Sequence, residues 1–316
     1  MNHGTMEGGT AQERERRERQ GLFVLALATF FFSLFALAGK AVSPAVTAPQ
    51  MVLVRSGFMV PILAAWALRR GDPLLGTRPS LLLLRGVLGS LGLFTFFFAL
   101  KRLPLADTVL IFQAHPLLVA ALAPWFLGER NRRVHWVLLS SSFLGVALVV
   151  GPTGAGSWPG RVSALACCMT ASFVYILVRY LRRSEATLTI AFSFPAASFL
   201  LFGAAFLFRV PGCEWHAPAP RDWVFLSAMA LCAAAGQVLL TFGLGRVPAA
   251  RGTALSNLQV FFAILYGALF FGEIPAWSTV AGAAVIVGAQ LLLAFTRKPP
   301  GDAGKGGVAA APGDPE

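Results

Sequence analysis

The sequence FALKRLPLADTVLIFQAHPLLVAALAPWFLGE (residues 98–129) recurs later in the chain as FGLGRVPAARGTALSNLQVFFAILYGALFFGE (residues 242–273). The two stretches align without a gap at a constant offset of 144 residues, which pairs Pro104 with Pro248. Both stretches also end in the same Gly-Glu dipeptide. The repetition indicates that the chain contains two copies of one structural unit.

The composition around this repeat is that of a membrane protein. Of the 316 residues, 56% are hydrophobic and 13% are charged, whereas about 25% of the residues of a soluble domain are charged. A disordered chain is excluded as well, because disordered segments are poor in apolar residues. The net charge of +12 does not require a nucleic acid partner, because membrane proteins collect Lys and Arg in their cytoplasmic loops.

Ten apolar runs are each close to the roughly 20 residues that cross a bilayer. They lie at about 22–38, 50–68, 81–100, 105–127, 134–151, 159–180, 187–208, 222–243, 249–271 and 276–296. The sequence therefore predicts an all-α membrane protein with ten transmembrane helices in two five-helix repeats. Because five is odd, the two repeats must run through the membrane in opposite directions.

The predicted organisation has four parts. Residues 1–20 form a frayed cytosolic tail, 21–151 the first repeat, 159–296 the second repeat, and 297–316 a disordered cytosolic tail rich in Gly, Pro and Ala. With the N-terminus inside, 18 of the 26 Lys and Arg residues fall on the cytoplasmic side. This bias predicts that both termini are cytoplasmic, and it leaves the identity of the membrane open.

No motif for a cofactor or metal stands out. The four cysteines do not form a disulfide framework, and no Cys/His spacing is typical of a metal site. Residues 301–305 lack the spacing and context of a phosphate-binding loop. We expect no cofactor and no metal.

The repeated pattern resembles a known transporter family. Each half carries R-x-P, then a helix of small and apolar residues, then L/F-G-E, then a closing helix with Gly145 or with Gly282 and Gly288. Over roughly residues 21–296 this pattern is similar to EamA-type transporters of the drug/metabolite transporter superfamily, and it also resembles the solute carrier 35 G group. The resemblance implies secondary transport of a small organic solute, often export, without naming the solute.

Four polar residues lie near the middle of the membrane at equivalent positions of the two repeats. Gln113 aligns with Asn257, and His115 aligns with Gln259. Polar side chains at this depth usually face a cavity or the bundle interior, although an interhelical hydrogen bond is the alternative. Two residues span about 200° of helix, so one pair is expected to line a cavity and the other to pack. Which pair does so stays open.

Charged residues inside the spans have competing interpretations. Arg55 either snorkels to the interface or holds an anionic group of the substrate. For Arg85 snorkelling is favoured, and for Asp107 a pairing with Lys101 or Arg102 is favoured over proton coupling. The further candidates for cavity contact are Tyr175, Gln237 and Gln290.

Other features are interpreted as architectural. The Gly-Glu pairs are expected to end helices, with each glutamate held in the interface by local backbone or an arginine. Small residues such as Gly86, Gly89 and Gly92 let neighbouring helices approach closely.

The function that this pattern favours is secondary transport by alternating access between two inverted halves, and we expect export. Two alternatives stay open, namely a membrane-embedded enzyme such as an acyltransferase and a membrane scaffold that transports nothing. No catalytic constellation stands at useful spacing, so the chain is not expected to be an enzyme. The expected partners are a small-molecule substrate and the lipid bilayer, with no nucleic acid, and a homodimer is compatible with the pattern.

Overall fold

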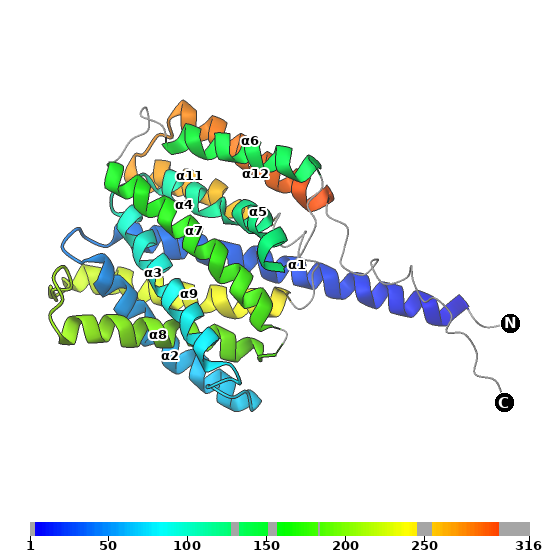
Figure 1. The fold of residues 1–316 in the computed structure, drawn as a ribbon, viewed down its shortest axis with the longest axis horizontal. Coiled ribbons are helices and arrows are strands. Elements are labelled where there is room, and N and C mark those ends of the chain that lie inside the picture. The colour runs from blue at the N-terminus through cyan, green and yellow to red at the C-terminus, as the bar shows by residue number, and fades with distance from the viewer. Residues whose placement is uncertain (1–3, 128–132, 151–156, 183, 245–254, 297–316) are drawn as a thin grey trace.

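A computed structural model describes residues 4–127, 133–150, 157–182, 184–244 and 255–296, and within these ranges every regular element is a helix. The helices are α1 (Gly4–Ala41), α2 (Ala48–Arg70), α3 (Pro79–Leu100), α4 (Leu105–Gln113), α5 (His115–Leu127), α6 (Arg133–Val150), α7 (Trp158–Leu181), α8 (Thr187–Leu207), α9 (Pro220–Leu244), α11 (Leu258–Phe271) and α12 (Trp277–Thr296). They form one bundle whose helices run roughly side by side (Figure 1).

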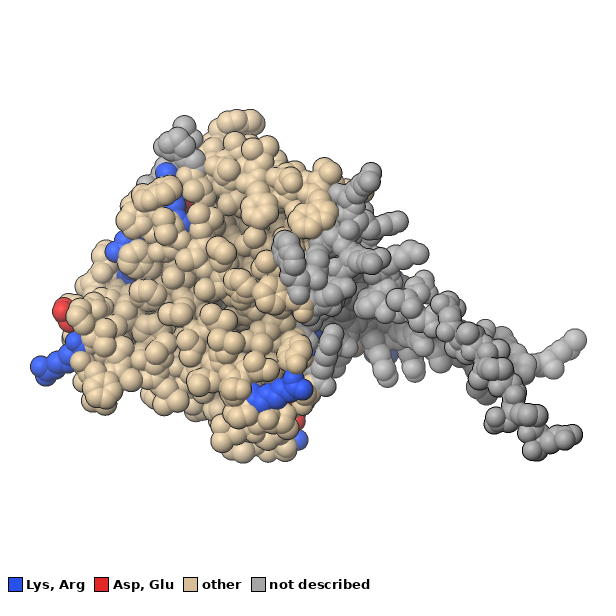
Figure 2. All heavy atoms as spheres, viewed as in Figure 1, with Lys and Arg blue, Asp and Glu red and all other residues tan. Residues whose placement is uncertain are grey.

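The helices are those of a multi-pass membrane protein. Within the described residues, seven candidate spans are long and apolar enough to cross a membrane, and three shorter apolar helices cover 136–150, 258–271 and 277–292. Figure 2 shows a face on which Lys and Arg side chains lie near the edges and the area between them is uncharged. An apolar belt of this kind suits contact with lipid.

The N-terminal helix is longer than the sequence predicts. α1 begins at Gly4, within the stretch 1–20 that the sequence assigns to a frayed tail. Arg and Glu are strong helix formers, and the run at 13–19 places Glu and Arg four residues apart, which supports a helix. The charged residues at 13–19 therefore continue the helix. As a result α1 projects from one end of the bundle (Figure 1).

We name the two ends of the bundle by their distance from this projection. The distal end, away from the N-terminus, carries the turns at 42–47, 101–104, 208–219 and 272–276, and the proximal end carries the turn at 71–78 and the described residues 182 and 184–186 of the α7–α8 turn. Glycines close two of these turns in the left-handed conformation, Gly71 at φ 74° and Gly272 at φ 63°. Glycine adopts this conformation without the cost that a Cβ would add.

Helices from the first half of the chain pack mainly on helices from the second half. α1 contacts α9, α3 contacts α7, α2 contacts α8, and α6 contacts α12. In the order of the repeat, α1, α2, α3 and α6 correspond to α7, α8, α9 and α12. If corresponding helices are exchanged, the α1–α9 contact becomes the α7–α3 contact, and the α2–α8 and α6–α12 contacts stay the same. The two halves are therefore interleaved rather than separate bodies.

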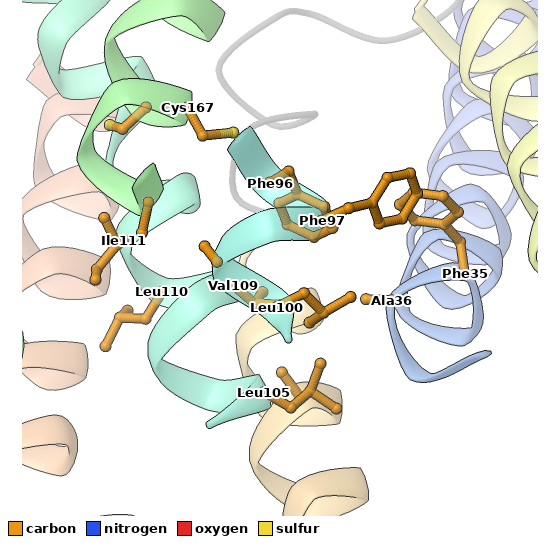
Figure 3. Packing of buried hydrophobic residues seen from close by; sticks show 14 of the residues in the cluster. Phe35, Ala36, Phe96, Phe97, Leu100, Leu105, Val109, Leu110, Ile111 and Cys167 are labelled. Atoms are coloured by element: carbon orange, nitrogen blue, oxygen red, sulfur yellow. The ribbon is translucent and has the colours of Figure 1, made fainter. Parts of the chain in front are cut away.

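One continuous apolar core joins the halves. Phe97, Leu100 and Leu105 are fully buried in it, and Phe35 stacks on Phe96 with ring centroids 6.0 Å apart (Figure 3). The core thus fixes α1 against α3 and the start of α4.

α6 and α12 cross at glycines. A Cβ at Gly282 would lie 2.7 Å from the carbonyl oxygen of Gly145, and one at Gly145 would lie 3.1 Å from the carbonyl oxygen of Gly282. Because neither glycine has a side chain, the two backbones approach closely. The closing helix of each half is therefore packed on that of the other.

A carboxylate fastens the proximal end. Glu185, in the α7–α8 turn, accepts hydrogen bonds from the Thr77 hydroxyl (2.6 Å) and from the backbone N–H groups of Thr77 (3.1 Å) and Arg78 (2.7 Å). These hydrogen bonds hold the pKa of Glu185 below its ordinary value of 4.5. The α2–α3 turn of the first half is thereby tied to the α7–α8 turn of the second.

The glycine crossing predicts the result of a matched pair of substitutions in α12. In Gly282→Ala the new methyl group meets the Gly145 carbonyl oxygen and Val149 Cγ2, so we expect the free energy of unfolding to fall by about 1–3 kcal/mol. Gly288→Ala meets no atom within 4 Å, and should be neutral or slightly stabilising. Thermal unfolding in detergent measures both, and equal melting temperatures would contradict the close crossing.

The hydrogen bonds that Glu185 accepts from Thr77 and Arg78, called the Glu185 clamp below, predict that the stability of the protein depends on pH. The pKa of Glu185 is lower in the folded protein than its ordinary value of 4.5. The stabilisation that its carboxylate provides is therefore present above pH 4.5, and it is lost as the pH falls from there through the lower pKa of the folded state. Glu185→Gln should therefore melt below the wild-type protein at neutral pH, and the difference should shrink in acid. If the difference stayed constant over this pH range, the clamp would not depend on the carboxylate charge.

Candidate substrate site

The fourth predicted span is broken in the middle of the membrane. α4 ends at Gln113 and α5 begins at His115, so the span predicted at 105–127, of which Leu105–Leu122 is one candidate span, contains a turn at Ala114. Pro116 has no N–H to donate to the Phe112 carbonyl oxygen, which accepts from His115 Nδ1 instead (2.9 Å). The break therefore has a cause in the sequence, and the side chain of a neighbouring residue satisfies the first freed carbonyl.

The equivalent part of the second half also contains a turn, at the position that aligns with Gln113. A turn at Asn257 precedes α11, which begins at Leu258, and Leu258 aligns with Ala114 at the offset of the repeat. Half-helices that end at mid-membrane are tolerated only where protein or water meets their free backbone groups. The two breaks therefore mark the same part of the bundle from both halves.

Side chains connect the two breaks. Gln113 Nε2 donates to the Ser256 carbonyl oxygen (2.7 Å), and Gln290 Nε2 on α12 donates to the Gln113 carbonyl oxygen. Both polar side-chain atoms of Asn257 and Oε1 of Gln290 are buried without a hydrogen-bond partner. Gln113 thus joins the halves, while Asn257 offers a donor and an acceptor that no described residue uses.

A second group of polar residues lies around Phe194 on α8. The guanidinium carbons of Arg55 (α2) and Arg85 (α3) lie 5.0 Å and 4.9 Å from the centre of the Phe194 ring, and that of Arg55 lies 5.6 Å from the Phe35 ring. Arg55 is 4% exposed and Arg85 9%. The sequence interpretation that Arg85 snorkels to the interface is wrong, because α8 packs over α3 at this point and encloses the side chain.

These arginines have no acidic partner within the described part of the chain. Nε and Nη1 of both side chains are buried without a hydrogen-bond acceptor, and the two positive charges are close enough to repel one another. Aromatic faces attract cations, but they do not accept the in-plane N–H groups of a guanidinium. The site therefore holds two cations and several unused donors.

His115 links the arginine group to the helix break. Its ring lies 4.5 Å from that of Tyr175 on α7 and 5.0 Å from that of Phe112, measured between centroids. Phe112 in turn lies 5.6 Å from Phe96 on α3, and Phe96 stacks on Phe35, the ring that lies against Arg55. A series of ring contacts therefore connects His115 and Tyr175 with the arginine group.

The exposed surface of Tyr175 faces the inside of the bundle. The side chain is 49% exposed, yet it lies about 120° around α7 from the exposed face of Met169 and Tyr180. It shares its side of the helix with Cys168 and Ala171, which are buried. Because this side faces protein, the accessible part of Tyr175 indicates an opening between the helices.

Two further predicted site residues lie on α11 and α9. Gln259 is buried in the first turn of α11, two residues after Asn257, and Gln237 is half-buried on α9. Asp107 is buried and accepts a hydrogen bond from Thr279 Oγ1 on α12 (2.7 Å). Its predicted pairing with Lys101 or Arg102 is therefore wrong, because α12 and not the preceding turn faces its carboxylate.

A large cavity opens at the distal end. Its volume is about 1430 Å³, and its walls include residues of α1, α3, α8, α9 and α11. Four cationic residues and one acidic residue line it, namely Lys40, Lys101, Arg102, Arg221 and Asp222. Burial lowers the pKa of Lys101 to about 8, and its Nζ donates to the Ser43 carbonyl oxygen (2.7 Å).

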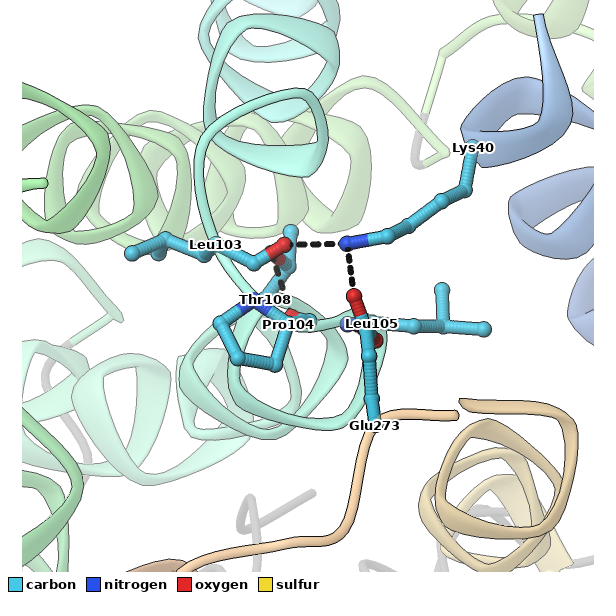
Figure 4. Close-up of polar contacts among 6 residues, drawn as sticks. All are labelled: Lys40, Leu103, Pro104, Leu105, Thr108 and Glu273. Carbon is cyan, nitrogen blue, oxygen red and sulfur yellow. Dashed lines mark hydrogen bonds and ion pairs between the residues drawn. The ribbon is translucent and has the colours of Figure 1, made fainter. Parts of the chain in front are cut away.

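Glu273 fastens the distal end beside this cavity (Figure 4). Its Oε1 pairs with Lys40 Nζ (2.6 Å), and its Oε2 accepts from the Leu105 N–H (2.8 Å) at the start of α4. The preceding Gly272 ends α11 in the left-handed conformation. The interpretation of this Gly-Glu pair as a helix end with an interface glutamate agrees with these contacts, with a lysine in place of the expected arginine. The other pair, Gly128-Glu129, lies outside the described residues.

Comparison with known proteins identifies the family. The EamA-like transporter family matches residues 19–151 and 158–295, so the chain belongs to this family, and the resemblance noted in the sequence is confirmed. The chain is 30% identical over 286 residues to the pseudopaline exporter CntI of Pseudomonas aeruginosa PAO1, covering 89% of this chain and 98% of that protein. It is 25% identical over 287 residues to human solute carrier family 35 member G1, covering 86% of this chain and 78% of that protein. A solved crystal structure with 21% identity superposes with a TM-score of 0.59, covers 88% of this chain and 98% of that one, and shares the fold.

The contacts of Glu273 predict a loss of stability when its charge is removed. Glu273→Gln leaves Lys40, whose side chain is 13% exposed, without its anion, so we expect the free energy of unfolding to fall by about 1–3 kcal/mol. Glu214→Gln, in an exposed loop, is the matched control and should change the melting temperature little. Equal melting temperatures of the two variants in detergent would show that the ion pair contributes nothing.

Proposed function

We propose that this member of the EamA-like transporter family exports a small organic metabolite by alternating access between two inverted five-helix halves. The proposal includes ten transmembrane helices and cytoplasmic termini. The observation that carries it is the pair of helix breaks at equivalent positions, joined across the halves by the hydrogen bond from Gln113 to Ser256. Discontinuous helices that meet at mid-membrane are typical of substrate sites in transporters built from inverted repeats.

The packing of the helices supports the inverted arrangement. The exchanged contacts of α1 with α9 and of α3 with α7 are those expected if an axis in the membrane plane relates the halves. Rocking of one half against the other would then open the two ends in turn. The fasteners at the two ends, Glu273 with Lys40 and Glu185 with Thr77, are the contacts that such a motion would have to change.

Export is favoured by similarity. The relative in Pseudomonas aeruginosa is an exporter and aligns over nearly its whole length. We therefore infer the same direction for this chain, with Gln113, His115, Asn257, Arg55 and Tyr175 contacting the solute at mid-membrane and Gln259 and Gln237 as further contacts.

A membrane-embedded enzyme is the weaker alternative. Within the described residues no group of three His, Cys, Asp or Glu side chains is placed to hold a metal ion. His115 has only ring contacts and a backbone partner there, and the relatives are transporters.

A cross-linking experiment tests alternating access. Ser43 in the α1–α2 turn donates to Asp222 at the start of α9 (2.9 Å), which joins the first half to the second at the distal end. In a Cys213→Ser, Cys232→Ser background, Ser43→Cys with Asp222→Cys and a short bis-methanethiosulfonate cross-linker, which joins both thiols through cleavable disulfides, should stop the release of metabolites from cells that express the protein. A reducing agent should restore it.

The control pair keeps one of the two cysteines. Ala219→Cys with Asp222→Cys, whose positions lie three residues apart in one segment, should be cross-linked without loss of release. Release is identified by comparing the metabolites that cells retain and release with and without the protein. If the pair across the halves could be linked without effect, the distal end would not move during transport, and if no metabolite depended on the protein, the transport proposal itself would fail.

A further inference from the structure

The most unusual feature of the bundle interior is the unbalanced charge of Arg55 and Arg85. Their side chains start at different depths, about 10 Å from the distal end of α2 and about 9 Å from the proximal end of α3 by helical rise, and they converge on Phe194. Nε and Nη1 of each are buried without an acceptor. Each unmet donor in a buried guanidinium lowers stability, and two like charges without an anion lower it further.

Lys40, a cation with a structural role, has different surroundings. Lys40 sits beside a carboxylate and a carbonyl oxygen, Glu273 at 2.6 Å and Leu103 at 2.5 Å. Among the described residues no carboxylate bonds to Arg55 or Arg85, and the rings around them attract the charge without accepting the N–H groups. The arginine pair therefore has the electrostatics of a site that awaits an anion, rather than those of an internal ion pair.

The surroundings limit the kind of solute that fits. Both guanidinium groups lie against the Phe194 ring, and Arg55 also lies against Phe35. The rings of Tyr175 and His115 contact one another, with centroids 4.5 Å apart. A solute that fits must bring oxygen acceptors to the arginines and an apolar or aromatic body to the rings. Planar carboxylates match the fork of a guanidinium.

We propose that Arg55 and Arg85 bind the carboxylate of the transported solute, with Phe194, Tyr175 and His115 forming the aromatic wall around its body. The substrate class is accordingly a small organic anion. This inference rests on the proposed function and extends it, because it adds Arg85 and Phe194 to the site and names the chemistry of the solute.

The distal cavity supports the same charge preference. Lys40, Lys101, Arg102 and Arg221 line it against the single carboxylate Asp222. A cleft of one predominant charge concentrates ions of the opposite sign. Both the cavity and the mid-membrane site are therefore suited to an anion.

Binding to the purified protein is the first test. Benzoate and glutarate are added at millimolar concentration in detergent, each beside its uncharged amide, benzamide or glutaramide, and the melting temperature is measured. We expect a carboxylate to raise the melting temperature where its amide does not, and the rise to disappear in Arg55→Gln and Arg85→Gln. Arg182→Gln, which removes an exposed cation from the α7–α8 turn at the proximal end, should keep the rise.

The melting temperature without any added anion separates a binding role from a structural one. If the arginines hold the fold together, both Gln variants should melt below the wild-type protein. If they bind the solute, removal of an unbalanced buried charge should leave the melting temperature without added anion equal or higher. Arg85→Lys, which keeps the charge but loses the fork, should bind the carboxylate at least about tenfold more weakly.

Release from cells is the second test. The metabolites whose release depends on the protein should be anions at neutral pH, and their release should fall by about tenfold or more in Arg55→Gln and Arg85→Gln. No carboxylate-specific shift in the wild-type protein, or release of only neutral or cationic metabolites, would overturn the anion site. Carboxylate binding without any protein-dependent release would instead retain the site and refute the transport proposal.

Discussion

Inside the membrane there is no water, so each backbone N–H and C=O group needs a hydrogen-bond partner within the protein. This constraint determines the structure at the centre of the bundle. Lipid offers no partner to a free carbonyl group, so a helix can break inside the membrane only where other groups replace the lost bonds. Pro116 removes one bond from α5, and the carbonyl oxygens of Phe112 and Gln113 are taken by His115 Nδ1 and Gln290 Nε2. The side chains that repair the backbone are therefore the same ones that give the middle of the bundle its polarity.

The same constraint connects the two halves. Because the freed carbonyl of Gln113 is met by α12, and the side chain of Gln113 meets the carbonyl of Ser256, neither break is complete without residues from the other half. The ends of the bundle are joined by a different chemistry, in which one carboxylate holds backbone N–H groups of the other half, as Glu185 does with Thr77 and Arg78. The polar contacts between the halves are therefore concentrated at the centre and at the two ends of the bundle.

The repeat and the apolar runs are sufficient to predict an all-helical membrane protein, because span length and composition depend on local sequence. The partners of the buried polar groups are not predictable in this way. Asp107 meets Thr279, and Arg85 meets Phe194, and each pair is more than one hundred residues apart in the chain. Only the packing of α12 and α8 decides these contacts.

Part of the missed information was nevertheless present in the sequence. Arg85 directly precedes Gly86, the first of three glycines at intervals of three, and a Cβ at Gly86 would lie 2.7 Å from the carbonyl oxygen of Ser193. Gly86 and Gly89 face Ser193 and Phe194 of α8, so an arginine at the edge of this side is enclosed rather than free to snorkel. Pro116, next to His115, gave a similar signal for the helix break.

The cost of the arginine pair explains its aromatic setting. A lone guanidinium inside the membrane is expensive, and a permanent carboxylate partner would remove that cost while also filling the place where an anion could bind. Aromatic rings are a compromise, since each attracts a cation weakly and leaves the N–H groups of the guanidinium unused. The Phe194 ring contacts both guanidinium groups, and the Phe35 ring makes a second contact with that of Arg55. If the arginines bind the solute as proposed, the weak attraction of the rings would offset part of the cost of burial and leave the guanidinium N–H groups free for a carboxylate, so the solute could be bound and then released.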